Sequence, residues 1–304
     1  MLYYKNSRIV GVKNMLNNVV GEFLDFLKKN KKLSNNTLES YNRDIKQFLN
    51  YLEEIEFEYY NVKKSTILNY LYYLKKKGKS QATVSRNLSS LKAFYHYLFM
   101  KKKIEEDPTY MINTPKVEKK PPTALTVEQV DMLLSIDFGN DEKGLRDKAL
   151  IELMYATGLK VSEVISLKLE DVNLSYGYVV IRSNKERVIP IGSHAIEALK
   201  NYIEKGRKTK YGENTLFLNL RGEKLTRQGC WKIIREYTDK INPGFPVTPN
   251  TLRQSFAQHM LQNGADIRAV QEMLGYQTDL NTNLLSLISK SKIKEVYNKF
   301  HPRA

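Results

Sequence analysis

A run of hydroxyl, amide and basic side chains after Ser80 is the clearest candidate for chemistry in this sequence. The apolar residues Val84, Leu88, Leu91 and Tyr95 recur at helical spacing and predict the buried face of a helix. The opposite face carries the polar residues Ser80, Gln81, Thr83, Ser85, Arg86, Ser89 and Lys92. Such groups contact phosphate oxygens in nucleic acids, which makes binding salt-dependent. An ordinary solvated helix face has the same pattern, and that alternative stays open at this point.

The histidines and the cysteine predict no metal site. No ligand motif matches the spacings of His96, His194, His259 and His301, and the chain has a single cysteine, Cys230. We therefore expect neither a metal nor a cofactor. We expect His259 and His301 to make structural hydrogen bonds, and Trp231 to lie in a core.

The net charge favours a polyanionic partner. The 304 residues include 49 Lys and Arg against 33 Asp and Glu, a balance of +16. Residues 1–121 carry 23 basic and 12 acidic side chains (+11), and residues 122–304 carry 26 and 21 (+5). Nucleic acid is the commonest partner of such proteins, and the first part of the chain is the more basic one. The alternative is a source organism whose proteins are generally rich in lysine.

The composition also excludes several classes of protein. A hydrophobic content of 41% excludes a fully disordered chain. No run of 18 apolar residues occurs, and the first residues lack the pattern of a secretory signal. With one cysteine and therefore no intramolecular disulfide, these features predict a soluble cytoplasmic protein, associated with the nucleoid if it binds DNA.

The elements that position these residues fall into two predicted domains, since single cores rarely exceed about 250–300 residues. Residues 15–112 read as a helical domain, with helices at 19–28, after Ser34, at 65–76 and after Ser80. Residues 113–122 contain three prolines and three lysines and predict a linker. Residues 123–304 predict helices at 126–135, 145–157, 226–240, 248–263, 267–274 and 292–300. Strands are predicted at 177–182 and 188–191, with a third at 215–219.

An ordered set of motifs resembles the tyrosine recombinase family, and its Xer-type chromosome-resolution members in particular. The motifs read, in family order, A-L-I-E-L-M-Y-A-T-G-L-K-V-S-E, N-K-E-R-V-I-P-I-G, L-T-R-Q-G-C-W, T-L-R-Q-S-F-A-Q-H-M-L, G-A-D-I-R-A-V-Q-E-M-L-G-Y and H-P-R-A. The resemblance implies a mainly α, two-domain chain. Its N-domain (15–112) would be a helical SAM-like core-binding domain. Its C-domain (123–304) would have the α+β fold of the catalytic domain, with a small antiparallel sheet.

The resemblance also implies six catalytic positions. In the family a tyrosine hydroxyl attacks a DNA phosphodiester, while arginine, lysine and histidine-type donors stabilise the charge that builds on the phosphoryl oxygens. In this sequence the family arginine of A-T-G-L-R is Lys160, the lysine is Arg182, the first histidine of H-x-L-R-H is Asn250, and the histidine of L-G-H is Tyr276. Arg253 is retained. The tyrosine position falls on Leu285.

Leucine has no nucleophilic atom, so the resemblance predicts a recombinase homologue that binds duplex DNA without cutting it, in an architectural or regulatory role. Three cations would remain in the phosphate pocket, although drift around a dead site would also explain the changes. The alternative is an active recombinase or topoisomerase-like enzyme that uses a displaced tyrosine, Tyr276 or Tyr297.

The C-domain carries further expected contacts. The resemblance places Lys185, Arg187, Arg227 and Gln228 at the DNA backbone or groove. The last residues, K-I-K-E-V-Y-N-K-F-H-P-R-A, correspond to a segment that couples subunits in the family. Ile293, Val296 and Phe300 form its apolar face. We expect self-association, or association with an active Xer-type relative, through this helix. Docking onto its own domain is the alternative.

Overall fold

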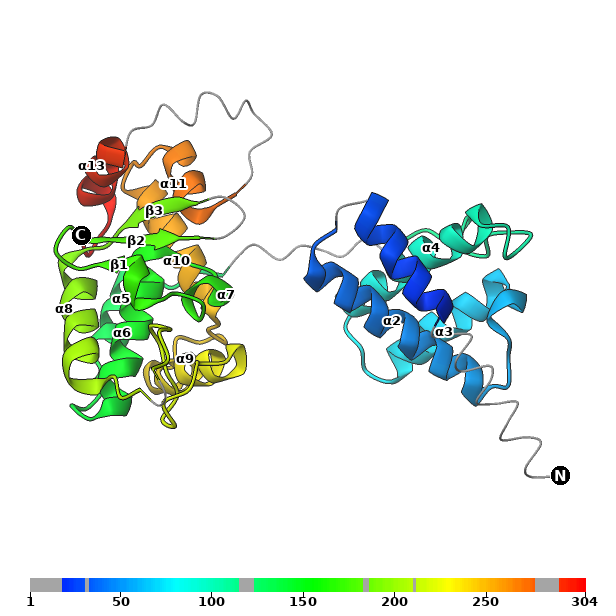
Figure 1. The fold of residues 1–304 in the computed structure, drawn as a ribbon, viewed down its shortest axis with the longest axis horizontal. Coiled ribbons are helices and arrows are strands. Elements are labelled where there is room, and N and C mark those ends of the chain that lie inside the picture. Colours follow the sequence, from blue (N-terminus) through cyan, green and yellow to red (C-terminus); the bar gives the residue numbers. More distant parts are fainter. Residues whose placement is uncertain (1–17, 31–32, 115–122, 183–185, 210–211, 277–289) are drawn as a thin grey trace. The chain divides into compact units, whose positions relative to one another are not determined.

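The computed structural model describes residues 18–30, 33–114, 123–182, 186–209, 212–276 and 290–304. The chain divides into two compact units, Met1–Lys120 and Pro121–Ala304 (Figure 1). Each unit has its own hydrophobic core. Among the described helices, none is long and apolar enough to cross a bilayer.

The N-terminal unit is a helical domain. Its described elements are a helix at 18–30, α2 (Asn35–Glu54), a short 3-10 turn, α3 (Lys64–Lys76) and α4 (Gln81–Met100). Ser34 and Ser80 start α2 and α4, because each side-chain oxygen accepts a hydrogen bond from the main-chain N–H three residues later. Both starts follow from the sequence.

Aromatic residues fill the core of this unit. The fully buried members of the core include Phe23, Phe48, Tyr70, Phe94 and Tyr95. Their rings meet edge to face, with centroids 5.4 Å apart for Phe23 and Phe94 and 4.8 Å apart for Phe48 and Tyr70. Such contacts fix α2, α3 and α4 against one another.

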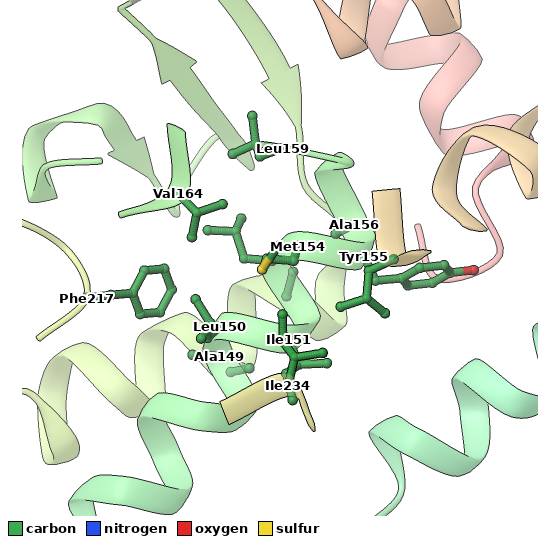
Figure 2. Packing of buried hydrophobic residues seen from close by; sticks show 14 of the residues in the cluster. Ala149, Leu150, Ile151, Met154, Tyr155, Ala156, Leu159, Val164, Phe217 and Ile234 are labelled. Atoms are coloured by element: carbon green, nitrogen blue, oxygen red, sulfur yellow. The ribbon is translucent and has the colours of Figure 1, made fainter. Parts of the chain in front are cut away.

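The C-terminal unit surrounds one buried helix, α6 (Glu142–Thr157). Residues 149–157 of α6 are all buried, so the helix is enclosed on every side along its second half. Figure 2 shows Phe217 and Ile234 approaching it from separate segments. The neighbours of α6 include α5 (Val127–Leu134), α8 (Ser193–Asn201), the π-helical turn η3 (Tyr202–Gly206), α9 (Arg227–Ile241) and α10 (Pro249–Gln262). The unit is completed by α7 (Val161–Val164), α11 (Ile267–Leu274) and α13 (Lys290–Phe300).

Within the described residues the strands form an antiparallel sheet in the order β1 (Val172–Asn173), β2 (Tyr178–Ile181), β3 (Arg187–Pro190). Val179 pairs with Val172 on one side and with Ile189 on the other. The predicted mainly α, two-domain fold with a small antiparallel sheet is therefore confirmed.

Three details differ from the prediction. The third strand is β1, whereas residues 215–219 form a buried loop held by single bridges and by bonds such as Leu216 N–H to Leu167 O (2.7 Å). Helices α7 and α8 were not predicted. Trp231 lies on the exposed side of α9, 42% accessible, with the Arg235 guanidinium 5.5 Å from its ring centroid.

Candidate nucleic-acid interface

Arg253 joins three segments of the C-terminal unit. It lies on α10 and is only 4% exposed. Its Nη1 donates to the carbonyl oxygen of Gly158 at the end of α6 (2.6 Å), and its Nη2 donates to that of Leu274 at the end of α11 (2.7 Å). A cation is favourable at both helix ends, where main-chain carbonyls lack helical partners.

A second arginine secures the same region from the sheet. Arg187, on β3, donates from Nε to the carbonyl of Met273 (2.9 Å) and from Nη2 to the carboxylate of Glu163 (2.9 Å). Both side chains of this ion pair are buried. Glu163 also accepts the main-chain N–H of Lys160, so the start of α7 belongs to the same network.

The glycines at the two helix ends permit this close packing. Gly158 has φ +59°, and a Cβ there would lie 2.6 Å from the Phe256 ring. Gly275 has φ +68°, and a Cβ would lie 2.8 Å from the Arg187 guanidinium carbon. The fold thus brings Gly158, Arg187, Arg253 and Leu274, which belong to four of the motifs, together in space.

The sequence-derived catalytic positions differ in their surroundings. Lys160 and Asn250 are exposed, and Asn250 lies one turn before Arg253 on α10. Tyr276 is 49% exposed, and its ring centroid is 5.1 Å from the Arg253 guanidinium carbon. Arg182 is exposed but donates to the buried carboxylate of Asp171 (2.7 Å), which raises the Arg182 pKa. Leu285 and Lys185 lie outside the described residues.

Tyr297 and the neighbouring histidines are structural. The Tyr297 hydroxyl accepts the Gly192 N–H (3.1 Å), and complete burial raises its pKa. His259 accepts from the Tyr155 hydroxyl (2.9 Å) and donates to the Leu125 carbonyl (2.9 Å), an arrangement that suits a neutral ring. Burial lowers the pKa of His259 and lowers that of His301 to about 3. The prediction of structural histidines is confirmed.

The polar face predicted on α4 is present. Ser80, Gln81 and Ser89 are exposed, and Thr83, Ser85, Arg86 and Lys92 are half-buried. The Ser80 and Thr83 hydroxyls lie 2.9 Å apart within the helix cap, and Ser89 donates to the Ser85 carbonyl (3.0 Å). Arg86 donates to the carboxylate of Asp44 on α2 (2.6 Å).

The residues of the C-domain that we expected to contact DNA differ in their exposure to solvent. Arg227 and Gln228 are exposed in the first turn of α9. Arg187 is turned inward, because Glu163 and the Met273 carbonyl hold it, so its guanidinium does not face solvent as expected. The sequence did not point to Asp44, Glu163 and Asp171. These carboxylates accept hydrogen bonds from Arg86, Arg187 and Arg182, respectively. For Asp44 the signal was present, since it lies four residues before Phe48 and therefore on the buried side of α2.

The C-terminal helix packs on its own domain in this structure. Ile293 and Tyr297 are buried in a cluster with Phe256 and Met260. After α13, Arg303 donates to the carboxylate of Glu152 on α6 (2.7 Å), a residue only 2% exposed. This conformation therefore corresponds to the alternative, in which the C-terminal helix docks onto its own domain.

Comparison with known proteins gives consistent matches. Residues 123–284 match the model of the phage integrase family, and residues 20–102 match the phage integrase N-terminal SAM-like domain. A protein of Caldanaerobacter subterraneus subsp. tengcongensis named as a tyrosine recombinase, TTE1313, is 74% identical, covering 95% of this chain and all of the relative. The tyrosine recombinase XerD of Halalkalibacterium halodurans is 43% identical, covering 95% of this chain and 99% of the relative.

Two solved structures share the fold. The XerH site-specific recombinase bound to its difH substrate superposes with a TM-score of 0.67 at 20% identity, covering 93% of this chain and 92% of that chain. The Tn1549 transposon integrase in complex with transposon right end DNA gives 0.66 at 20% identity, covering 92% and 93%.

Proposed function

This chain belongs to the phage integrase family, and we propose that it is an Xer-like member that binds duplex DNA without cutting it, in an architectural or regulatory role. The observation that carries the proposal is Leu285 at the position of the family's nucleophilic tyrosine. A leucine side chain has no oxygen that can attack phosphorus, so no covalent intermediate forms there.

The other replacements point the same way. Lys160 in place of arginine loses the planar fork that matches two phosphate oxygens. Removing one such preorganised donor typically lowers a rate by about 10²–10³. Arg253 and Arg182 keep their charge, but Gly158 and Leu274 hold the first and Asp171 holds the second.

The alternative, a displaced tyrosine, finds little support in the two candidates. Tyr297 is fully buried, so its hydroxyl has no access to solvent, and burial raises its pKa. Tyr276 is exposed, but its ring faces the Arg253 guanidinium.

DNA binding is supported by charge and by surface chemistry. The N-terminal part is the more basic half of a +16 chain. On α4 it presents hydroxyl, amide and basic groups, and the first turn of α9 exposes Arg227 and Gln228. In the Tn1549 integrase, a chain of the same fold carries DNA.

Two measurements test the proposal. The first is incubation with nicked suicide duplexes, which trap any phosphotyrosine, and we expect no covalent adduct. Restoring the family residues together (Lys160→Arg, Arg182→Lys, Asn250→His, Tyr276→His, Leu285→Tyr) should produce one. The same variant with Leu285→Phe is the matched control without a hydroxyl. An adduct formed by the unmodified chain contradicts the loss of cleavage.

The second measurement is a gel shift against genomic duplexes at physiological salt. We expect some sites to bind more tightly than random duplex. Equal affinity for every sequence contradicts sequence-directed binding, and no binding even at low salt contradicts the DNA-binding function itself.

We also propose that residues 292–304 mediate association with a second copy or with an active relative on DNA. Because α13 packs in its own domain in this structure, association requires the helix to leave that site. Mass measurement on a duplex long enough for two copies tests this, and a strictly monomeric complex contradicts it.

A further inference from the structure

The N-terminal unit contains a buried carboxylate at the contact of two helices. Asp44 on α2 is 1% exposed. Its Oδ2 accepts from Arg86 Nη1 (2.6 Å) and from the Ser90 hydroxyl (2.8 Å), both on α4. Arg86 and Ser90 are four residues apart and therefore lie on the same side of α4.

We expect this arrangement to contribute little to folding. Removing a carboxylate from water is costly, and burial raises the pKa of Asp44. Among the described residues, its Oδ1 is buried without a hydrogen-bond partner. A buried ion pair of this kind often stabilises a protein no more than a neutral or apolar replacement of the same shape.

The partner of Asp44 lies at the surface. The Arg86 side chain is 40% exposed, beside the exposed Ser89 and the half-buried Ser85 and Lys92 on the polar face of α4. A guanidinium is a rigid fork with five N–H donors, so fixing Nη1 inward also fixes the direction of the remaining donors.

We propose that Asp44 is a positioning residue that holds the Arg86 guanidinium ready to bind a DNA phosphate. The inference rests on the proposed DNA-binding function and adds a residue to it. An unrestrained arginine loses rotamer freedom when it binds, whereas Arg86 has lost much of that freedom on folding. In this proposal, a gain in DNA affinity offsets the free-energy cost of burying the Asp44 carboxylate.

The sign of the effect on DNA affinity distinguishes positioning from simple electrostatics. Asp44→Asn keeps the shape but removes a negative charge near a polyanion, which by itself strengthens DNA binding. Positioning predicts the opposite, because the neutral amide holds Arg86 less firmly. A purely structural brace predicts a third result, namely a loss of stability.

The test uses the full chain and a random duplex of about 30 base pairs, roughly three helical turns, since phosphate contacts do not depend on sequence. We expect Asp44→Asn to weaken binding about tenfold, the scale of one charge-assisted hydrogen bond. The slope of log affinity against log salt should fall by about 0.9, as for one lost phosphate contact. Its midpoint of urea unfolding should equal or exceed that of the unmodified chain.

Three further variants complete the cycle. Arg86→Ala should give the same losses of DNA affinity and salt slope as Asp44→Asn, and the double variant should add nothing to these losses. Ser90→Ala removes the other hydrogen bond to the same oxygen, and Glu22→Gln removes a charge from an exposed pair in the same unit. Both should leave the affinity within about twofold.

The outcomes separate the two proposals. If the unmodified chain binds but Asp44→Asn binds equally or more tightly, or fails to fold, the positioning role is wrong and DNA binding stands. Additive effects in the double variant also overturn it. If the unmodified chain does not bind duplex DNA at low salt, both proposals are wrong.

Discussion

Replacing Arg253 with alanine should destabilise the C-terminal unit far more than it weakens DNA binding. The buried guanidinium donates to the Gly158 and Leu274 carbonyls, and alanine leaves both without that partner. Each unsatisfied buried acceptor costs about 1–3 kcal/mol, so we expect a loss of about 4 kcal/mol in the free energy of unfolding. For a unit of this size that corresponds to a fall in Tm of about 10 °C.

Urea and thermal unfolding measure this loss, and fluorescence anisotropy with labelled duplex measures affinity well below the Tm. Arg268→Ala is the matched control, because Arg268 is an exposed arginine on α11, close in sequence to Leu274. It should change stability by no more than about 0.5 kcal/mol. An Arg253→Ala protein that unfolds at the original Tm but binds DNA about tenfold more weakly would refute the reasoning, since Arg253 would then act on phosphate and not on the helix ends.

Two further predictions concern the C-terminal residues. Burial lowers the folded-state pKa of His301 to about 3 from an ordinary 6.5, so its contribution to stability is complete above pH 6.5 and is lost as the pH falls toward 3. Urea titrations should show stability falling on acidification, and His301→Gln should reduce that slope by up to about 1.4 kcal/mol per pH unit. Arg303→Met leaves the buried Glu152 without its partner and should cost about 3 kcal/mol, whereas adding Glu152→Gln should recover most of the loss. If the double variant is no more stable than Arg303→Met, the pair is not the source of the effect.

The sequence alone predicted most of the helices. Helix starts such as Ser80 are local, because the cap and the first turn are encoded within four residues. Helix α8 was missed although its buried residues Ala195, Ala198 and Leu199 recur at helical spacing, two of them being small.

The error at Trp231 has a readable cause. The buried residues of α9 include Cys230, Ile233, Ile234 and Tyr237, a spacing of three and four that leaves position 231 outside the stripe. We expected Trp231 to be buried because of its residue type, but its position on α9 leaves it exposed.

The sequence did not reveal which groups the arginine side chains contact. The motifs identify Arg182, Arg187 and Arg253, but their partners are Asp171, Glu163 and main-chain carbonyls that lie far away in sequence or carry no side-chain signal. Such contacts follow from tertiary packing, so the sequence predicts a basic pocket while the structure contains arginines that are largely committed to internal contacts.

The double anchorage of Arg253 bears on how activity is assigned to uncharacterised relatives. An arginine that ties the ends of two helices together contributes to folding, whatever happens to the chemistry beside it. Its presence in a family member is therefore a sign of a folded domain and a poor marker of an active enzyme. In our proposal the more informative marker is the residue at the family's tyrosine position, here Leu285, because a leucine has no oxygen that could attack phosphorus.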